Sequence, residues 1–289
     1  MSARPEFDPP RPAVVDAVSR ALAEDIGPLG DISAALVPGD ATVVVDVVPR
    51  APGVLAGTAC ATESFAQLEP GVRVTWSAAD GDRMEPRVAV GRIEGPLRAV
   101  LTGERTALNF LCHLSGVATL TRRFVDAAAG SGTARIVETR KTLPGLRALE
   151  KAAVRAGGGA NHRGSLSDLV LVKDNHLGGT SIAEAVARAR SQWPGRGVEI
   201  ECDRAAQVEE ALAAGADVVM LDNMTPEAAT ACVAVVRASA RPWTLVEISG
   251  GVTLDTVAAY AATGADVIST SAITQSAPAL DLGFDLAVE

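Results

Sequence analysis

The chain has 289 residues, and its sequence predicts an α/β protein in two parts, a small mixed α+β unit followed by alternating strands and helices. Three observations predict this class. Short apolar runs recur through the second half, helical patterns separate them, and one segment occurs twice, at residues 214–219 and 263–268. Alternation of this kind implies right-handed crossovers and a parallel sheet, either open or closed.

Six apolar runs of the second half are predicted to be strands, because each is too short for a helix and rich in Val, Ile and Leu. Each reads as apolar on both faces, as expected for a sheet covered on both sides. The runs are residues 135–137, 169–172, 198–200, 218–221, 245–248 and 267–268. Six strands are fewer than the eight of a full (β/α) barrel, so a barrel here is expected to be incomplete or to include an irregular strand.

The intervening helices have recognisable boundary signals. Pro144 lies near the start of one, and Gly157 follows its end. Two more are predicted with a capping residue and a final glycine, namely Asp203 with Gly215 and Thr253 with Gly264. The segment Ala-Gly-Ala-Asp-Val-Val at 214–219 returns as Thr-Gly-Ala-Asp-Val-Ile 49 positions later, which equals two strand–helix units.

The first half has a different pattern. Strands are predicted at 42–48, 72–76 and 88–93, with a helix at 60–68, and a long helix from about 103 to 129 between Thr102 and Gly130. We therefore predict an N-terminal domain of residues 1–115, on which the tail 276–289 packs, and a catalytic domain of residues 116–275.

Composition excludes several classes of protein. A net charge of −9 and an aromatic content of 3% argue against nucleic-acid binding. No apolar run is long enough to span a bilayer, and Met1 to Pro12 lacks the apolar stretch of a secretory signal, so we expect a cytoplasmic protein without a membrane partner. The four cysteines form no C-x-x-C pair, which argues against a structural zinc site and a disulfide framework.

Basic residues are concentrated in one segment of this acidic chain. All three lysines, Lys141, Lys151 and Lys173, lie there, and residues 135–174 contain eight basic and four acidic residues, a net charge of +4. Such a local excess of positive charge suits a small anionic ligand.

Polar residues follow every predicted strand, at the edge where parallel α/β folds bind ligands. Arg140, Lys141 and Lys173, with His162 and Arg163 from a glycine-rich loop, are expected to form a cationic wall. Arginine binds carboxylate or phosphate in a two-point fork, so this wall predicts a ligand with more than one carboxylate.

Acidic residues and a glycine pair are predicted to complete the site. Glu201 and Asp222 are expected to face the cationic wall, where carboxylates bind sugar hydroxyls or magnesium and stabilise a cationic carbon. Ser249-Gly250-Gly251 and the loop at Thr270 are predicted to hold a phosphate. No nucleophilic triad is evident, so glycosyl transfer through an oxocarbenium-like state fits best.

Arg105 is predicted to lie in the first turn of the long helix, where the helix dipole disfavours a cation. The adjacent Glu104 is expected to compensate part of this effect. The functional interpretation is that Arg105 points at an anion that is bound in its own subunit or in a neighbouring one.

Several segments resemble the quinolinate phosphoribosyltransferase family, from about residue 20 to the C-terminus. The most specific are Glu-Thr-Arg-Lys at 138–141 and Lys-Asp-Asn-His at 173–176, in that order. Further matching segments lie at 24–31, 103–109, 198–202, 220–224 and 247–252. One segment departs from the family pattern: Ser271 replaces a glycine and Gln275 a histidine of the usual Gly-Ala-Leu-Thr-His-Ser.

The resemblance implies an N-terminal α/β sandwich, an incomplete α/β barrel and a homodimer, and it is compatible with a hexamer. It implies that quinolinate and phosphoribosyl pyrophosphate react with Mg²⁺ to give nicotinate mononucleotide, pyrophosphate and CO₂ in NAD biosynthesis. By motif, Arg105 from the neighbouring subunit would hold the two carboxylates of quinolinate together with the cationic wall, beside Thr139. The residues implied to be catalytic are Lys141, at the pyrophosphate, and Glu201 and Asp222, at the ribose and the metal. Those implied to cradle the 5′-phosphate are Ser249, Gly250, Gly251, Thr270, Ser271 and Ala272.

Three alternatives remain open. A related phosphoribosyltransferase, such as the molybdenum-cluster-associated relatives, would prefer another acid to quinolinate in a binding titration. A class I aldolase would use Lys173 as a Schiff-base lysine, which borohydride traps in the presence of a keto acid. A non-catalytic binding protein would bind ligand tightly without releasing pyrophosphate.

Overall fold

The structure is a computed structural model that describes residues 5–287; residues 1–4 and 288–289, which the predicted domains include, lie outside the described residues. The chain divides into two compact units. Unit 1 comprises residues 1–122, 142–158 and 273–289, and unit 2 comprises residues 123–141 and 159–272. Each unit therefore contains segments that are distant in the sequence.

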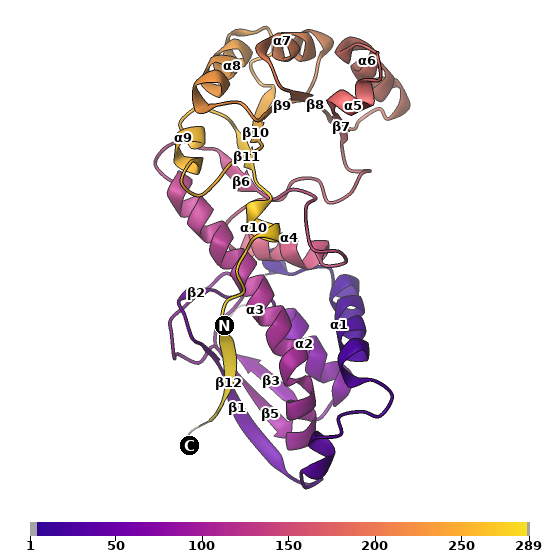
Figure 1. The fold of residues 1–289 in the computed structure, drawn as a ribbon, viewed down its shortest axis with the longest axis vertical. Coiled ribbons are helices and arrows are strands. Elements are labelled where there is room, and N and C mark those ends of the chain that lie inside the picture. The colour runs from indigo at the N-terminus through magenta and orange to yellow at the C-terminus, as the bar shows by residue number, and fades with distance from the viewer. Residues whose placement is uncertain (1–4, 288–289) are drawn as a thin grey trace. The chain divides into compact units, whose positions relative to one another are not determined.

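Unit 1 is built on a four-stranded antiparallel sheet with the order β12-β1-β5-β3. The strands are β1 Thr42–Pro49, β3 Arg73–Trp76, β5 Gly91–Pro96 and β12 Leu282–Leu286, with the short pair β2 Gly53–Val54 and β4 Arg83–Met84 outside this sheet. The helices are α1 Arg11–Ile26, α2 Thr58–Leu68, α4 Arg147–Ala156 and α3 Leu97–Ala128, of which residues 123–128 belong to unit 2 (Figure 1). The 3₁₀ turns are η1 Pro5–Phe7 and η2 Ala34–Leu36.

The core of unit 1 lies between its sheet and the helices α2 and α3. Val47 of β1 and Ile93 of β5 are buried with Phe65 of α2 and Leu111 of α3. These positions follow from the sequence, since alternate residues of a strand point to one face and form the apolar side of the sheet.

Two boundaries of unit 1 differ from the prediction. β5 begins at Gly91 rather than at residue 88, because the backbone N–H of Val88 donates a hydrogen bond to the carbonyl of Glu85 in a turn. α3 begins at Leu97, directly after β5, so Thr102 lies within the helix, where its hydroxyl donates to the carbonyl of Arg98. Although α3 has 32 residues, no helix among residues 5–287 has the length and apolar character that a membrane span requires.

Unit 2 contains a six-stranded parallel sheet with the order β6-β11-β10-β9-β8-β7. The strands are β6 Arg135–Val137, β7 Val170–Val172, β8 Val198–Cys202, β9 Val218–Asp222, β10 Leu245–Ser249 and β11 Val267–Ser269. The helices that follow are α5 Asp174–Leu177, α6 Ile182–Gln192, α7 Ala205–Ala214, α8 Pro226–Ala238 and α9 Val257–Ala261. Helix α10, Ala272–Gln275, begins at the last residue of unit 2 and otherwise belongs to unit 1. The predicted α/β class and parallel sheet of fewer than eight strands are confirmed.

The two faces of the parallel sheet differ in character, contrary to the prediction that its strands are apolar on both sides. Helices α6 to α9 pack on one face, as Figure 1 shows, and that face is formed by buried side chains such as Ile200, Val219 and Ile248. The alternate residues of the same strands, among them Glu201 and Met220, point to the opposite face and line a pocket. A glutamate inside an apolar run therefore marked a polar inner face.

Helix boundaries were predicted better at the C-terminal end than at the N-terminal end. Gly215 follows α7 in the left-handed conformation, with φ 85°, as a residue without a Cβ allows. α7 begins after Arg204 rather than Asp203, and α9 begins after Thr256 rather than Thr253. α4 ends at Ala156 and Gly157 follows it, as predicted, whereas α9 ends at Ala261, before the predicted Gly264.

Candidate active site

A pocket of about 510 Å³ lies at the carboxyl ends of the strands of unit 2. Its size suits a small-molecule ligand. The pocket brings together residues that lie on the six strands or directly after them, although they are spread over more than 100 positions of the sequence. The predicted residues that line it are Thr139, Arg140, Lys141, His162, Arg163, Lys173, Glu201, Asp222, Ser249, Gly250 and Gly251.

The cationic side of the pocket comes from two edges of the sheet. Arg140 and Lys141 follow β6, and the hydroxyl of Thr139 accepts a hydrogen bond from the backbone N–H of Lys141, which turns this segment. Arg163 lies near Arg140: burial and the neighbouring Arg140 charge together lower its pKa. Lys173 follows β7 at the other edge. Closely spaced cations repel one another, so a bound anion would stabilise them.

The acidic side comes from two neighbouring strands of the sheet. Glu201 lies on β8 and forms an ion pair with Lys173. Asp222 is the last residue of β9, and its carboxylate accepts a hydrogen bond of 2.7 Å from the side-chain amide of Asn223. The pocket therefore presents cations and carboxylates to the same space, as the sequence predicted.

The loop after β10 exposes backbone rather than side chains. Gly250 has φ 86° and Gly251 has φ 64°, a left-handed backbone conformation that residues with a Cβ rarely adopt. A Cβ at Gly250 would lie 2.3 Å from Oδ1 of Asn223, so only glycine fits there. Asn223 itself donates its backbone N–H to the carbonyl of Ser249, which fixes the loop beside Asp222. Successive glycines of this kind let an anion approach the backbone N–H groups.

Four predicted residues do not line this pocket. The backbone N–H of Thr270 donates to Val137 and its hydroxyl lies 3.2 Å from the carbonyl of Val252, while Ser271 and Ala272 follow it into α10. Ser269, to which the prediction assigned no role, lines the pocket in their place.

Arg105 lies on α3 in unit 1 with its side chain 77% exposed, 3.6 Å from Glu104. Since α3 begins at Leu97, Arg105 is not in its first turn, and the dipole argument made from the sequence is wrong.

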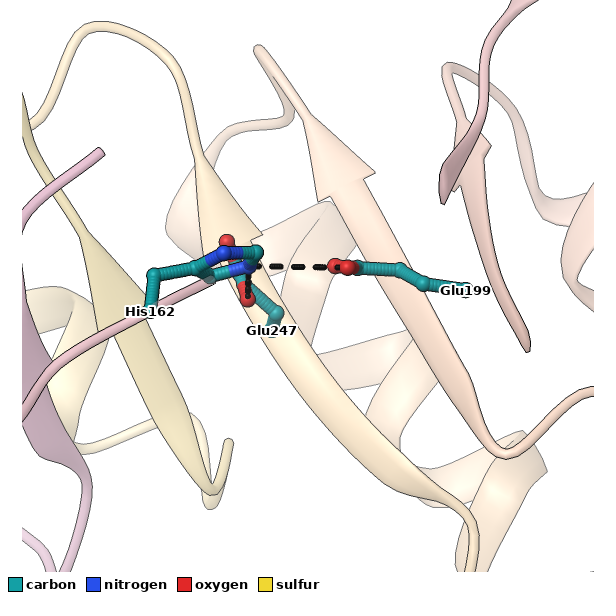
Figure 2. Close-up of side chains that lie close together, drawn as sticks. All are labelled: His162, Glu199 and Glu247. Carbon is teal, nitrogen blue, oxygen red and sulfur yellow. Dashed lines mark ion pairs between the residues drawn. The ribbon is translucent and has the colours of Figure 1, made fainter. Parts of the chain in front are cut away.

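Three buried glutamates were given no role in the predicted site. Glu199 and Glu247 face the imidazole of His162: Nε2 lies 3.0 Å from Glu247 and 3.5 Å from Glu199 (Figure 2). Glu138 accepts hydrogen bonds from the backbone N–H of His162 and the amide of Asn161. The available signal was a charged residue inside the apolar runs of β8 and β10.

These carboxylates change the protonation of the pocket. Burial by itself lowers the pKa of His162, but the carboxylates of Glu199 and Glu247 beside Nε2 together outweigh burial and raise the pKa to about 10. His162 is therefore a cation at neutral pH and belongs to the cationic side of the pocket. Burial raises the pKa of Glu199.

Two family models match the chain in succession. The model described as the quinolinate phosphoribosyl transferase N-terminal domain matches residues 31–115, and the model of the C-terminal domain of the same family matches residues 117–285. Together they account for most of the chain.

Curated relatives and solved structures agree with these models. The nicotinate-nucleotide pyrophosphorylase (carboxylating) of Mycobacterium leprae is 42% identical over 97% of this chain and 98% of its own length. The human protein of the same name is 40% identical over 88% of this chain and 85% of its own. The structure of the nicotinate-nucleotide pyrophosphorylase from Francisella tularensis aligns with a TM-score of 0.91 and 36% identity, covering 99% of this chain and 100% of that one. The chain belongs to the quinolinate phosphoribosyltransferase family.

Proposed function

We propose that the protein transfers a phosphoribosyl group from phosphoribosyl pyrophosphate to quinolinate, giving nicotinate mononucleotide, pyrophosphate and CO₂ for NAD synthesis. The observation that carries the proposal is the pocket in which Arg140, Arg163 and Lys173 share one space with Glu201 and Asp222. A doubly acidic pyridine complements the cations, and a ribose that becomes positively charged in the transition state complements the carboxylates.

The cationic side holds the acid. Arg140, Arg163, Lys173 and His162 bind the two carboxylates of quinolinate, with Thr139 beside them, and orient the ring nitrogen towards C1 of the ribose. Lys141 is exposed at the mouth of the pocket, where it contacts the departing pyrophosphate. Binding both reactants in one orientation removes much of the entropic barrier.

The carboxylates Glu201 and Asp222 bind the ribose hydroxyls and would hold a magnesium ion. Carboxylate oxygens at the ends of neighbouring strands, facing one pocket, are the hard ligands that Mg²⁺ prefers. The ion, when bound, supplies positive charge to the pyrophosphate leaving group. The negative charge of Glu201 and Asp222 also stabilises the oxocarbenium-like ribose electrostatically.

Backbone N–H groups at Ser249, Gly250 and Gly251 bind the 5′-phosphate. The left-handed glycines of this loop support this assignment, because they leave the backbone accessible to an anion.

Decarboxylation follows ribosyl transfer. Once the ring nitrogen is bonded to C1 of the ribose it is quaternary and positively charged. The adjacent carboxylate then leaves as CO₂, its electron pair remains on the ring carbon next to this nitrogen, and a proton replaces it. The nitrogen cation stabilises the carbanion, so the protein has only to hold the ring in place.

A homodimer completes the site in this proposal. Arg105 is strongly exposed in its own unit, and its guanidinium would reach the carboxylates bound in the pocket of a second copy of the chain. We also propose that the protein acts in the cytoplasm, where its reactants are ordinary metabolites. Lys173 forms an ion pair with Glu201, which does not suit a Schiff-base lysine of an aldolase, because such a lysine has to lose its proton before it attacks.

The test is a pyrophosphate-release assay with the purified full-length protein, quinolinate, phosphoribosyl pyrophosphate and Mg²⁺. We expect steady release that stops when quinolinate, the pyrophosphate donor or the metal is omitted. Release with nicotinate but not with quinolinate would instead identify a related phosphoribosyltransferase that uses another acid.

A further inference from the structure

Two buried carboxylates on the inner face of the parallel sheet have no role in the reaction described above. Glu199 on β8 is fully buried, and Glu247 on β10 is 2% exposed. Burying a carboxylate costs free energy, and an apolar side chain of similar volume would pack on the sheet without that cost. Their presence beneath the pocket therefore needs an explanation beyond packing.

Both carboxylates are directed at one imidazole. Oε2 of Glu247 and Oε2 of Glu199 lie 3.0 and 3.5 Å from Nε2 of His162, and they come from β10 and β8, the two strands that flank β9 (Figure 2). Among residues 5–287, neither oxygen of Glu199 accepts a hydrogen bond, nor does Oε1 of Glu247. The imidazole is therefore the main group that compensates these charges.

The backbone of His162 is fixed as firmly as its ring. Glu138, which follows β6 and is fully buried, accepts the backbone N–H of His162 at 3.0 Å and the side-chain amide of Asn161 at 2.8 Å. Carboxylates on β8 and β10 and directly after β6 thus hold one residue of the pocket wall, whose side chain is 12% exposed. A side chain held from both ends loses little further entropy when a ligand binds.

We propose that Glu199 and Glu247 are positioning residues, which hold the imidazole of His162 in one orientation and in its protonated form so that it binds a carboxylate of the pyridine diacid. This inference rests on the proposed function, because it assumes that His162 contacts the acid.

The groups around His162 act on its protonation in opposite directions. Besides Glu199, Glu247 and Glu138, the charged groups beside it are Arg163 and Arg140, and these cations oppose a proton on the ring. The backbone N–H of Arg163 lies 2.8 Å from Nδ1, which suits a neutral ring. Two buried carboxylates at Nε2 outweigh that single contact, because charge-assisted hydrogen bonds are the stronger kind. On protonation the ring gives up the contact, and Nδ1–H donates to a ligand carboxylate.

Imidazole NMR tests the positioning without any catalysis. The chain has three histidines, so ¹⁵N-histidine labelling gives few signals, and His113→Gln and His176→Gln assign them. We expect His162 in the free protein to remain protonated on both nitrogens at pH 8. In Glu247→Gln, and separately in Glu199→Gln, its titration midpoint should fall by more than about one pH unit. Exposed Glu209→Gln is the matched control and should leave the midpoint unchanged.

A His162 signal that titrates near its ordinary value of about 6.5 in the unmodified protein would overturn the proposal, as would a midpoint that neither substitution moves. Both glutamine variants keep the shape of the side chain. Thermal unfolding of each variant establishes that it is folded before its spectrum is compared.

Kinetics then show whether the pair acts through His162. We expect Glu247→Gln to raise KM for quinolinate about tenfold while KM for phosphoribosyl pyrophosphate changes less than about twofold. In a double-mutant cycle, adding Glu247→Gln to His162→Gln should cost less than about twofold more, since the mediator is already gone. Additive losses would contradict a positioning role. If the unmodified protein releases no pyrophosphate from quinolinate, the proposed function fails, whereas the NMR result still decides how His162 is held.

Discussion

Asp217 and Asp266 occupy equivalent positions in the sheet of unit 2, 49 residues apart. Each accepts a hydrogen bond of 2.7 Å from a backbone N–H near the start of a neighbouring strand, at Val198 of β8 and Val246 of β10 respectively. Each also accepts one from an arginine, Arg190 for Asp217 at 2.8 Å and Arg237 for Asp266 at 2.7 Å. The aspartate of each Gly-Ala-Asp segment therefore links a helix and a neighbouring strand to the strand that it precedes.

The first prediction concerns the stability that Asp217 provides. Burial by itself raises its pKa, but hydrogen bonds from Arg190 and Val198 outweigh burial, so the pKa is lowered. Because the folded-state pKa lies below the unfolded value, the stabilisation is complete above about pH 4 and is lost as pH falls through the lowered pKa. Asp217→Asn should cost about 1 kcal/mol at pH 7, a value reduced by solvent exposure, and less below about pH 3.

Urea unfolding at pH 7 and pH 3 measures this difference, with exposed Asp255→Asn as the control. A loss for Asp217→Asn that is the same at both pH values would show that the charge of Asp217 has no part in stability.

The second prediction concerns the start of α2. The carboxylate of Asp80, which is 8% exposed, accepts the backbone N–H groups of Gly57 at 2.9 Å and Thr58 at 3.3 Å. Burial raises the pKa of Asp80 despite these hydrogen bonds, so the ionised form is costly. Asp80→Ala should destabilise by about 1–3 kcal/mol, because two buried donors lose their acceptor, whereas Asp80→Asn should cost less than half as much. Denaturant unfolding of both variants decides this, and equal losses would mean that the charge is required.

The third prediction concerns the glycine loop after β10. Gly250→Ala places a Cβ 2.3 Å from Oδ1 of Asn223 in a left-handed backbone, so the loop has to shift. We expect KM for phosphoribosyl pyrophosphate to rise by about tenfold or more while KM for quinolinate changes much less, because the loop faces the phosphate. Gly130→Ala is the control: its φ is 82° with open space around it, so it has the strain without the clash. Equal increases in both KM values would place the loop outside the phosphate site.

The fourth prediction concerns the cationic wall. Arg140→Ala and Lys173→Ala should each lower kcat/KM for quinolinate by the equivalent of about 2–5 kcal/mol, because each leaves a bound carboxylate without its partner. Exposed Arg188→Ala, on α6, should change it by less than about twofold. Near-normal efficiency of both Arg140→Ala and Lys173→Ala would remove these residues from the site.

The convergence of the pocket was predictable from sequence because it depends on topology. Parallel strands place their carboxyl ends at one edge, so Arg140, Lys173, Glu201 and Asp222 had to meet once their strands were identified. The strand runs were identifiable from their composition, and all six belong to the observed sheet.

The inner face of the sheet was not predicted, because each strand run was read as uniformly apolar. Glu199 and Glu247 were counted as part of apolar runs, although a two-residue period places them with Glu201 and Ser249 on the pocket face. Their roles depend on contacts with His162 across the sheet, and sequence spacing does not specify such contacts. The early start of α3 was missed for a different reason, since no loop separates it from β5.

The central claim is that this pocket holds a pyridine diacid against an activated ribose and releases both pyrophosphate and CO₂. The most direct measurement is the stoichiometry of a single turnover with quinolinate labelled in the carboxylate next to the nitrogen. The account predicts one labelled CO₂ for each pyrophosphate, with nicotinate mononucleotide as the remaining product. Pyrophosphate without labelled CO₂, or neither product, would contradict it.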